Sequence, residues 1–115
     1  MAYEKALKII ERLHRKTQEG ELEWEEGPNN ETYQVSFPDY SITIESISDL
    51  STAEEYEIVI RNSDGRVLER FSDLDVPKIQ DTSGTKIFEE IFNQARRYAL
   101  GTDKALDDIL GALSR

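Results

Sequence analysis

The stretch TQEGELEWEEG, Thr17–Gly27, contains the only tryptophan of the chain and five glutamates. From Glu21 the residues alternate, so that Leu22 and Trp24 lie on one side of an extended chain and glutamates lie on the other. A half-buried antiparallel strand has this pattern. We therefore predict that Trp24 and Leu22 are core residues of a strand whose outer side is acidic. The alternative is an exposed Trp24 that anchors a partner, since tryptophan is enriched at interface hot spots.

The residues before this stretch predict a helix. Their apolar positions recur at steps of three and four, which places one apolar stripe on a helix of about five turns. The stripe consists of Tyr3, Ala6, Leu7, Ile10, Leu13 and Thr17. Gly20 follows the last of these positions and can adopt the left-handed conformation that closes a helix.

The residues after this stretch predict further strands. A turn at 27–30 precedes three segments of alternating polarity, Tyr33–Phe37, Tyr40–Ile44 and Tyr56–Ile60, with a polar loop at Ser48–Glu55. We predict Val67–Phe71 as a fifth strand. Asn62–Gly65 joins the last two strands, and both a type I turn and a two-residue type I′ turn remain open there.

The C-terminal third predicts more helix. After a polar connection at Ser72–Thr85, apolar positions repeat without loss of phase across Gly101. They are Phe88, Phe92, Ala95, Ala99, Thr102, Leu106, Ile109 and Leu113. This phase favours one long helix or two nearly coaxial ones. The alternative is a kink or break at Gly101, because glycine weakens a helix and Thr102 is a good N-cap. The fold class expected for residues 1–115 is a single α+β domain: an antiparallel β-meander of four or five strands flanked by an N-terminal and a long C-terminal helix.

The net charge of −10 is unevenly distributed. Residues 1–19 carry five basic and three acidic side chains, and the remaining residues carry nine basic and 21 acidic ones. An acidic surface repels a phosphate backbone, so we expect no nucleic-acid partner. The chain is charged from Glu4 onward and has no apolar run long enough to span a membrane, so we expect a cytoplasmic protein with no membrane partner.

Two groups of basic residues are candidate interaction sites. Lys5, Lys8, Arg12, Arg15 and Lys16 recur at helical spacing, and Arg96 and Arg97 stand beside Tyr98. The first group either docks to an anionic surface or is a solvated helix face. The second group either grips an anion or pairs with nearby acids such as Glu89, Glu90 or Asp103.

The glutamates between Glu19 and Glu26 have two interpretations. They either attract a basic protein, as the acidic surfaces of small inhibitors and immunity proteins do, or prevent a strand from pairing with another molecule.

No spacing in the chain is typical of a catalytic, metal or cofactor site. There is no cysteine, and the single histidine, His14, is expected to be a half-exposed helix residue. The sequence also lacks the phosphate-binding glycine loop, the nucleophile elbow and the calcium loop. We therefore assign no catalytic residue, metal or cofactor.

The elements quoted above carry a family resemblance. The pattern Thr17-x-x-Gly20-x-Leu22-x-Trp24, the hairpin at Asp64–Gly65 and the Ala95-Arg-Arg-Tyr-Ala99 segment are similar to those of small uncharacterised bacterial proteins built as helix, antiparallel sheet and long helix. The resemblance implies Thr17 and Gly20 as helix-ending residues and Trp24 as a core anchor, and it carries no assigned activity.

The expected function is a small acidic binding or regulatory protein that acts through protein contacts without catalysis. The alternatives are an acidic antagonist of a toxin or nuclease, and an enzyme with an unrecognised carboxylate site. The heptad regularity of the C-terminal stripe also favours pairing with a second copy.

Overall fold

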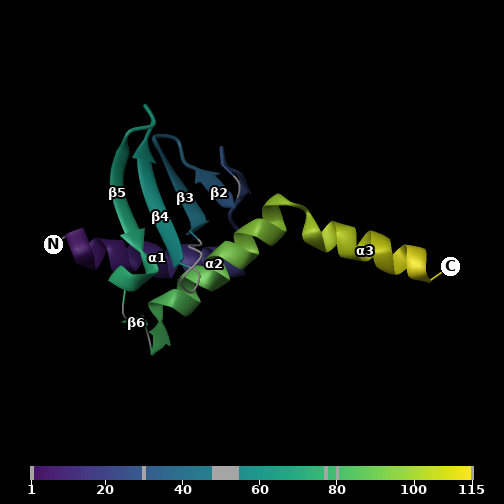
Figure 1. The fold of residues 1–115 in the computed structure, drawn as a ribbon. Helices are drawn as coiled ribbons and strands as arrows, with labels where there is room; N and C mark the ends of the chain where they lie inside the picture. Colours follow the sequence, from purple (N-terminus) through teal and green to yellow (C-terminus); the bar gives the residue numbers. More distant parts are fainter. Residues whose placement is uncertain (1, 30, 48–54, 77, 80, 115) are drawn as a thin grey trace.

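The computed structural model describes residues 2–29, 31–47, 55–76, 78–79 and 81–114. It confirms the α+β fold, with an N-terminal helix, a five-stranded antiparallel sheet and two C-terminal helices (Figure 1). The elements are α1 (Ala2–Gln18), β1 (Glu25–Glu26), β2 (Thr32–Ser36), β3 (Tyr40–Ile47), β4 (Glu55–Asn62), β5 (Val67–Ser72), the 3-10 helix η1 (Asp73–Asp75), β6 (Lys78–Ile79), β7 (Thr82–Ser83), α2 (Gly84–Ala99) and α3 (Thr102–Leu113). The predicted loop at Ser48–Glu55 lies outside the described residues, except for Glu55, which begins β4.

The sheet is a meander in the order β1-β2-β3-β4-β5, and its apolar face holds the core. The register places Ile44 opposite both Tyr33 and Ile58, so inward side chains of adjacent strands meet. Both α1 and α2 pack on this face, α1 through Ile10 and Leu13 and α2 through its buried aromatic and aliphatic positions. The alternation predicted for the strands β2, β3 and β4 is therefore confirmed.

The other face of the sheet is polar. Arg61 Nη1 donates to Thr43 Oγ1 at 3.1 Å, and Arg70 Nη1 lies 2.7 Å from Glu57 Oε1. Val59 also lies on this side and is nonetheless buried. Long charged side chains can cover apolar surface with their stems, so this face needs no helix over it.

Trp24 is buried, as predicted, with 3% of its surface exposed. Its indole Nε1 donates to Thr17 Oγ1 at 3.2 Å, so the polar end of the ring is satisfied within the core. The predicted strand around it is wrong in its position, because β1 contains only the next two residues. The chain stays close to the end of α1 through the bond from Glu21 N to Lys16 O, and reaches β2 only at Glu25.

Helix α1 follows the prediction. Ala6, Ile10, Leu13 and Thr17 are buried, Leu7 is half-buried, and the side chain of Tyr3 lies outside the described residues. Gly20 has a φ of +73°, the left-handed conformation expected after the helix.

The turn between β4 and β5 is the type I alternative. Gly65 N donates to Asn62 O at 3.0 Å, and the Asn62 side chain accepts from the amides of Asp64 and Arg66. This is the hydrogen bond of a type I turn, followed by a glycine with positive φ.

The connection predicted at Ser72–Thr85 is more ordered than its composition indicates. Asp73, in η1, is buried and accepts hydrogen bonds from Tyr56 N at 3.2 Å and from Thr85 Oγ1 at 2.8 Å. This carboxylate therefore ties the start of β4 to the start of α2. A β-carbon on Gly84 would lie 1.7 Å from Val76 O, so only glycine fits where α2 begins.

The favoured prediction of one long or nearly coaxial C-terminal helix is wrong, and the alternative break at Gly101 is confirmed. Gly101 has a φ of +65° and separates α2 from α3. Figure 1 shows the two helices running in clearly different directions. Arg97 Nη2 lies 2.5 Å from Asp103 Oδ1, which links the helices across the break.

Replacing Trp24 with alanine should lower the free energy of unfolding by about 3 to 5 kcal/mol, because a large buried side chain is lost and Thr17 loses its donor. Chemical denaturation followed by circular dichroism measures this. The matched control is Tyr98→Ala in α2, an exposed aromatic whose loss should cost less than about 1 kcal/mol. Equal effects of the two substitutions would contradict the burial of the indole.

Gly84→Ala should destabilise the protein by about 3 kcal/mol or more, because the new methyl group meets the backbone of Val76. Gly111→Ala in α3 is the control, since its β-carbon would have no neighbour within 4 Å. Thermal unfolding of the two variants should separate them clearly. A Gly84→Ala protein with the stability of the parent would show that the η1–α2 junction is loosely packed.

Candidate functional site

An open apolar groove of about 490 Å³ lies between α1 and the end of the sheet that carries the β2–β3 and β4–β5 turns. The lining residues are Ile9, Arg12, Leu13, Lys16, Leu22, Phe37, Tyr40, Ile42, Ile60 and Leu68. Its size is in the range of ligand-binding sites. We treat this groove as the candidate functional site.

The groove exists because the helices leave part of the apolar sheet face uncovered. Phe37, Tyr40 and Leu68 are 41%, 52% and 48% exposed, whereas Ile44 on the same face is fully buried. Clusters of large exposed apolar side chains are typical of interaction surfaces.

A β-bulge adds one of these residues to the groove. Glu69 pairs with Ile60 and Val67 pairs with Arg61, so Leu68 is an extra residue in β5. A bulge redirects side chains locally. Here Leu68 joins Ile60 in the groove lining instead of pointing to the polar face.

The α1 side of the groove is basic. Arg12 and Lys16 belong to its lining, and both also line an open hollow on α1 together with Lys8, Arg15 and Glu11. Lys16 Nζ lies 2.8 Å from Glu21 Oε2. Arg12 forms no ion pair or side-chain hydrogen bond within the described part of the chain. Its guanidinium is therefore a cation available beside apolar surface.

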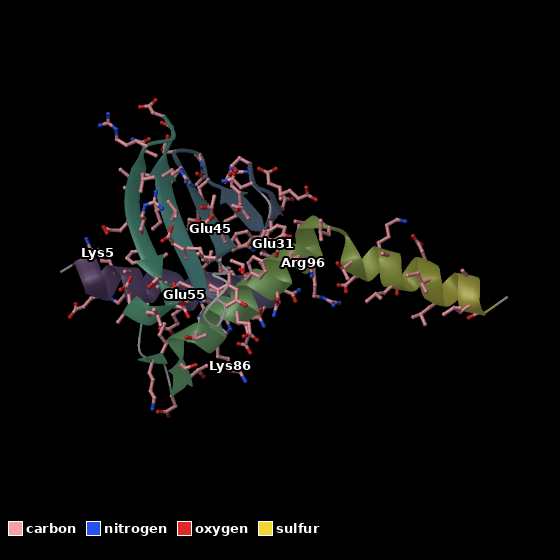
Figure 2. All side chains as sticks on the ribbon, in the orientation of Figure 1. Lys5, Glu31, Glu45, Glu55, Lys86 and Arg96 are labelled. Atoms are coloured by element: carbon pink, nitrogen blue, oxygen red, sulfur yellow. The ribbon has the colours of Figure 1, made fainter. Side chains whose placement is uncertain are left out.

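The structure brings together only some of the predicted interaction residues. The hollow on α1 brings together Lys8, Arg12, Arg15 and Lys16. Leu22, which the sequence predicts only as a core residue, also lines the groove. Lys5 is exposed on α1 and lies outside both hollows. Figure 2 shows that Lys5 and Arg96 belong to different helices.

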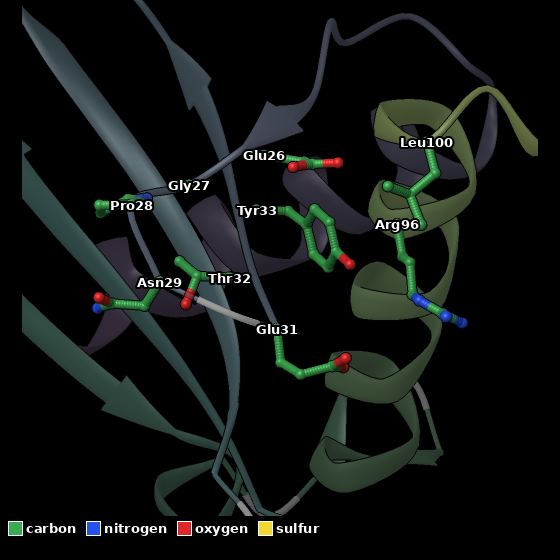
Figure 3. Close-up of a pocket in the computed structure, with 9 residues that line it drawn as sticks. All are labelled: Glu26, Gly27, Pro28, Asn29, Glu31, Thr32, Tyr33, Arg96 and Leu100. Atoms are coloured by element: carbon green, nitrogen blue, oxygen red, sulfur yellow. The ribbon is translucent and has the colours of Figure 1, made fainter.

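Arg96 lines a second, polar hollow, which Figure 3 shows in close-up. Glu26, Glu31 and Tyr33 approach it from the sheet side, and Arg96 and Leu100 approach it from the end of α2. Two carboxylates against one guanidinium disfavour an anion. Arg97 lies apart from this hollow in its pair with Asp103, as one of the predicted alternatives had it.

The acidic residues beside Trp24 are all exposed: Glu19, Glu21, Glu23, Glu25 and Glu26. Since the indole faces inward, these carboxylates form a surface of their own and do not frame a binding aromatic residue.

Two titratable side chains with catalytic potential have structural partners. His14 is half-buried, as predicted, and its Nε2 lies 2.8 Å from Glu90 Oε1, which joins α1 to α2. The carboxylate of Asp73 is occupied by Tyr56 N and Thr85 Oγ1. No group of three or more His, Asp or Glu side chains suited to a metal ion occurs within the described ranges.

None of the helices in the described ranges has the length and apolar content needed to traverse a lipid bilayer.

Exposed groove residues should contribute little to stability. Tyr40→Ala and Leu68→Ala should each change the free energy of unfolding by less than about 1 kcal/mol, whereas Ile44→Ala, on the same sheet face but fully buried, should cost about 2 to 5 kcal/mol. Urea denaturation of the three variants measures the difference. A large loss at Leu68 would mean that the groove is part of the core.

The comparisons with known proteins found no match: no protein-family model, no curated protein and no solved structure matches this chain. The function is therefore argued from the geometry of the groove.

Proposed function

We propose that this is a non-enzymatic, cytoplasmic binding protein that acts through protein contacts, and that its groove takes an amphipathic helix with acidic residues beside the apolar face. The open apolar groove, with Arg12 and Lys16 along one wall and the Arg12 guanidinium outside any ion pair of the described chain, carries this proposal. An amphipathic helix placed in an apolar groove is a recurring mode of peptide recognition.

The chemistry of the lining favours a protein segment over a small metabolite. Metabolite sites combine apolar walls with a few polar groups that fix the ligand's orientation. Beyond Arg12 and Lys16 at one wall, the lining here is aliphatic and aromatic. Such a surface recognises apolar side chains presented in a row, and the cations select what flanks them.

An acidic antagonist is the second candidate. Its support is the exposure of all five glutamates between Glu19 and Glu26 on a protein of net charge −10. Such a surface would accelerate encounter with a basic toxin or nuclease, and binding would weaken strongly with added salt. The groove would have no part in that interaction.

The groove should bind a synthetic amphipathic helix that carries leucines on one face and aspartates beside them. Fluorescence anisotropy of the labelled peptide, titrated with dilute protein, measures this binding. Arg12→Glu should weaken binding by roughly 10-fold, because an attraction becomes a repulsion. Lys86→Glu is the matched control, since it makes the same charge change at an exposed position at the start of α2, outside the groove lining.

The same peptide with lysines in place of the aspartates should bind more weakly to the parent protein than the acidic peptide does. Equal binding of both peptides, or an Arg12→Glu effect no larger than that of Lys86→Glu, would contradict a basic wall that selects acidic helices. Binding of the lysine peptide that is lost on mutating Glu23 and Glu25 would instead favour the antagonist.

A further inference from the structure

Helix α3 carries an apolar stripe that the described part of its own chain leaves largely exposed. Leu106, Ile109, Leu110 and Leu113 are 45%, 53%, 62% and 76% exposed, and no described residue of α3 is buried. Figure 2 shows α3 extending away from the sheet and from the other helices. The chain is accordingly extended, with a radius of gyration of 15.3 Å. A compact domain of this length would have roughly 13 Å.

Helix α3 lacks the tertiary packing that stabilises most short helices in proteins. It has 12 residues, with Gly111 in its last turn. Helices shorter than about 12 to 15 residues are marginal in water on their own, and glycine weakens them further. A partner on the apolar stripe would provide the missing stabilisation.

The charges beside the stripe are mainly negative. At about 100° per residue, Asp103 and Asp107 lie along the edge of the stripe next to Leu110. Asp103 pairs with Arg97, and Lys104 Nζ lies 2.8 Å from Asp108 Oδ2. Asp107 has no ion pair within the described part of the chain. Helix α3 therefore has the properties that the groove is proposed to select: a row of apolar side chains with a free carboxylate beside it.

We infer that the groove is occupied by α3 of a second copy of this chain, and that two copies exchange their α3 helices reciprocally. The inference rests on the proposed function, because it names the helix that the groove binds. In the pair, Leu106, Ile109 and Leu110 of one copy contact Phe37, Tyr40 and Leu68 of the other, and Asp107 approaches Arg12. A reciprocal exchange is a closed two-fold arrangement, which ends at the dimer.

Charge disfavours the simpler pairing of α3 with α3. Helix α3 contains three aspartates and one lysine, so two α3 helices packed on each other would bring like charges together. In the groove Asp107 meets the basic wall of α1 at Arg12. Docking of α3 into the groove of its own chain is opposed by the left-handed turn at Gly101 and the Arg97–Asp103 ion pair, which direct α3 away from the body.

The test is the mass of four proteins, the parent and three variants, by sedimentation equilibrium over a range of concentrations. The parent should form a dimer that dissociates on dilution. Leu68→Glu, in the groove, and Leu110→Glu, on α3, should each raise the dimer Kd by at least about 100-fold, since each contact occurs twice per dimer. Leu74→Glu is the matched control, because Leu74 is 70% exposed and belongs to neither surface.

Mixing the two variants should restore association. The Leu68→Glu chain has an intact α3 and the Leu110→Glu chain has an intact groove, so a mixed pair keeps one of the two contacts. Co-sedimentation of a fluorescently labelled Leu68→Glu chain with unlabelled Leu110→Glu chain should be detected, with a Kd above that of the parent. Thermal unfolding of each variant checks its fold, and Tyr40→Glu replaces Leu68→Glu if that chain does not fold.

A parent that stays monomeric, a mixture that does not associate, or assemblies that grow beyond the dimer would each overturn the exchange. If the Leu68→Glu chain dimerises as tightly as the parent, the dimer forms through α3 alone, which would also overturn the exchange. Binding of the acidic synthetic peptide by the Leu110→Glu chain separates this result from the proposed function. If that chain binds the peptide while the parent is monomeric, the groove binds helices and only the second-copy inference fails.

Discussion

The buried contact between Trp24 and Thr17 determines how the N-terminal half of the molecule is arranged. The hydrogen bond joins residues only seven positions apart, so the chain must reverse between α1 and the sheet within that distance. Helix α1 is thereby held beside α2 on the apolar face, with Ile10 and Leu13 in the core. It also covers only part of that face, because its position is set at its C-terminal end. The groove is the uncovered remainder.

The sequence predicts the elements of the fold because local periodicity reports which side of an element is buried. The alternation in Tyr33–Phe37 and Tyr40–Ile44 and the stripe in α1 each reflect one buried face, and the structure has both. The same periodicity places Trp24 correctly in the core, although the strand β1 contains only the two residues after it. Alternation in the sequence indicates which side chains point into the core. It does not indicate whether the backbone lies close enough to a neighbouring strand to form hydrogen bonds with it.

The groove could not be predicted from the same signals. Phe37 and Tyr40 have the pattern of core residues, and whether a helix covers them depends on the length and direction of α1 in three dimensions. Leu68 lies in the groove only because of the bulge opposite Ile60, and nothing in the spacing of β5 indicates an extra residue. The direction of α3 escaped prediction for a related reason. The spacing of apolar residues across Gly101 indicates the apolar face of each helix. A single residue with positive φ, here Gly101, changes the direction of the helix axis without changing that spacing.

The charge distribution indicates how the groove can select an acidic helix on a protein that is itself acidic. At physiological ionic strength the screening length is about 8 Å, so the net charge of −10 acts weakly on a distant partner and Arg12 acts only on a group beside it. Under the proposed function, electrostatic steering would therefore contribute little to the encounter with an acidic helix, and burial of apolar side chains in the groove would supply most of the affinity. The basic wall would act at contact, by discriminating between helices that present carboxylates and helices that present amines beside Arg12. The fold supports this division of roles because it places Arg12 in one groove lining with Phe37 and Leu68, which are far from it in the sequence.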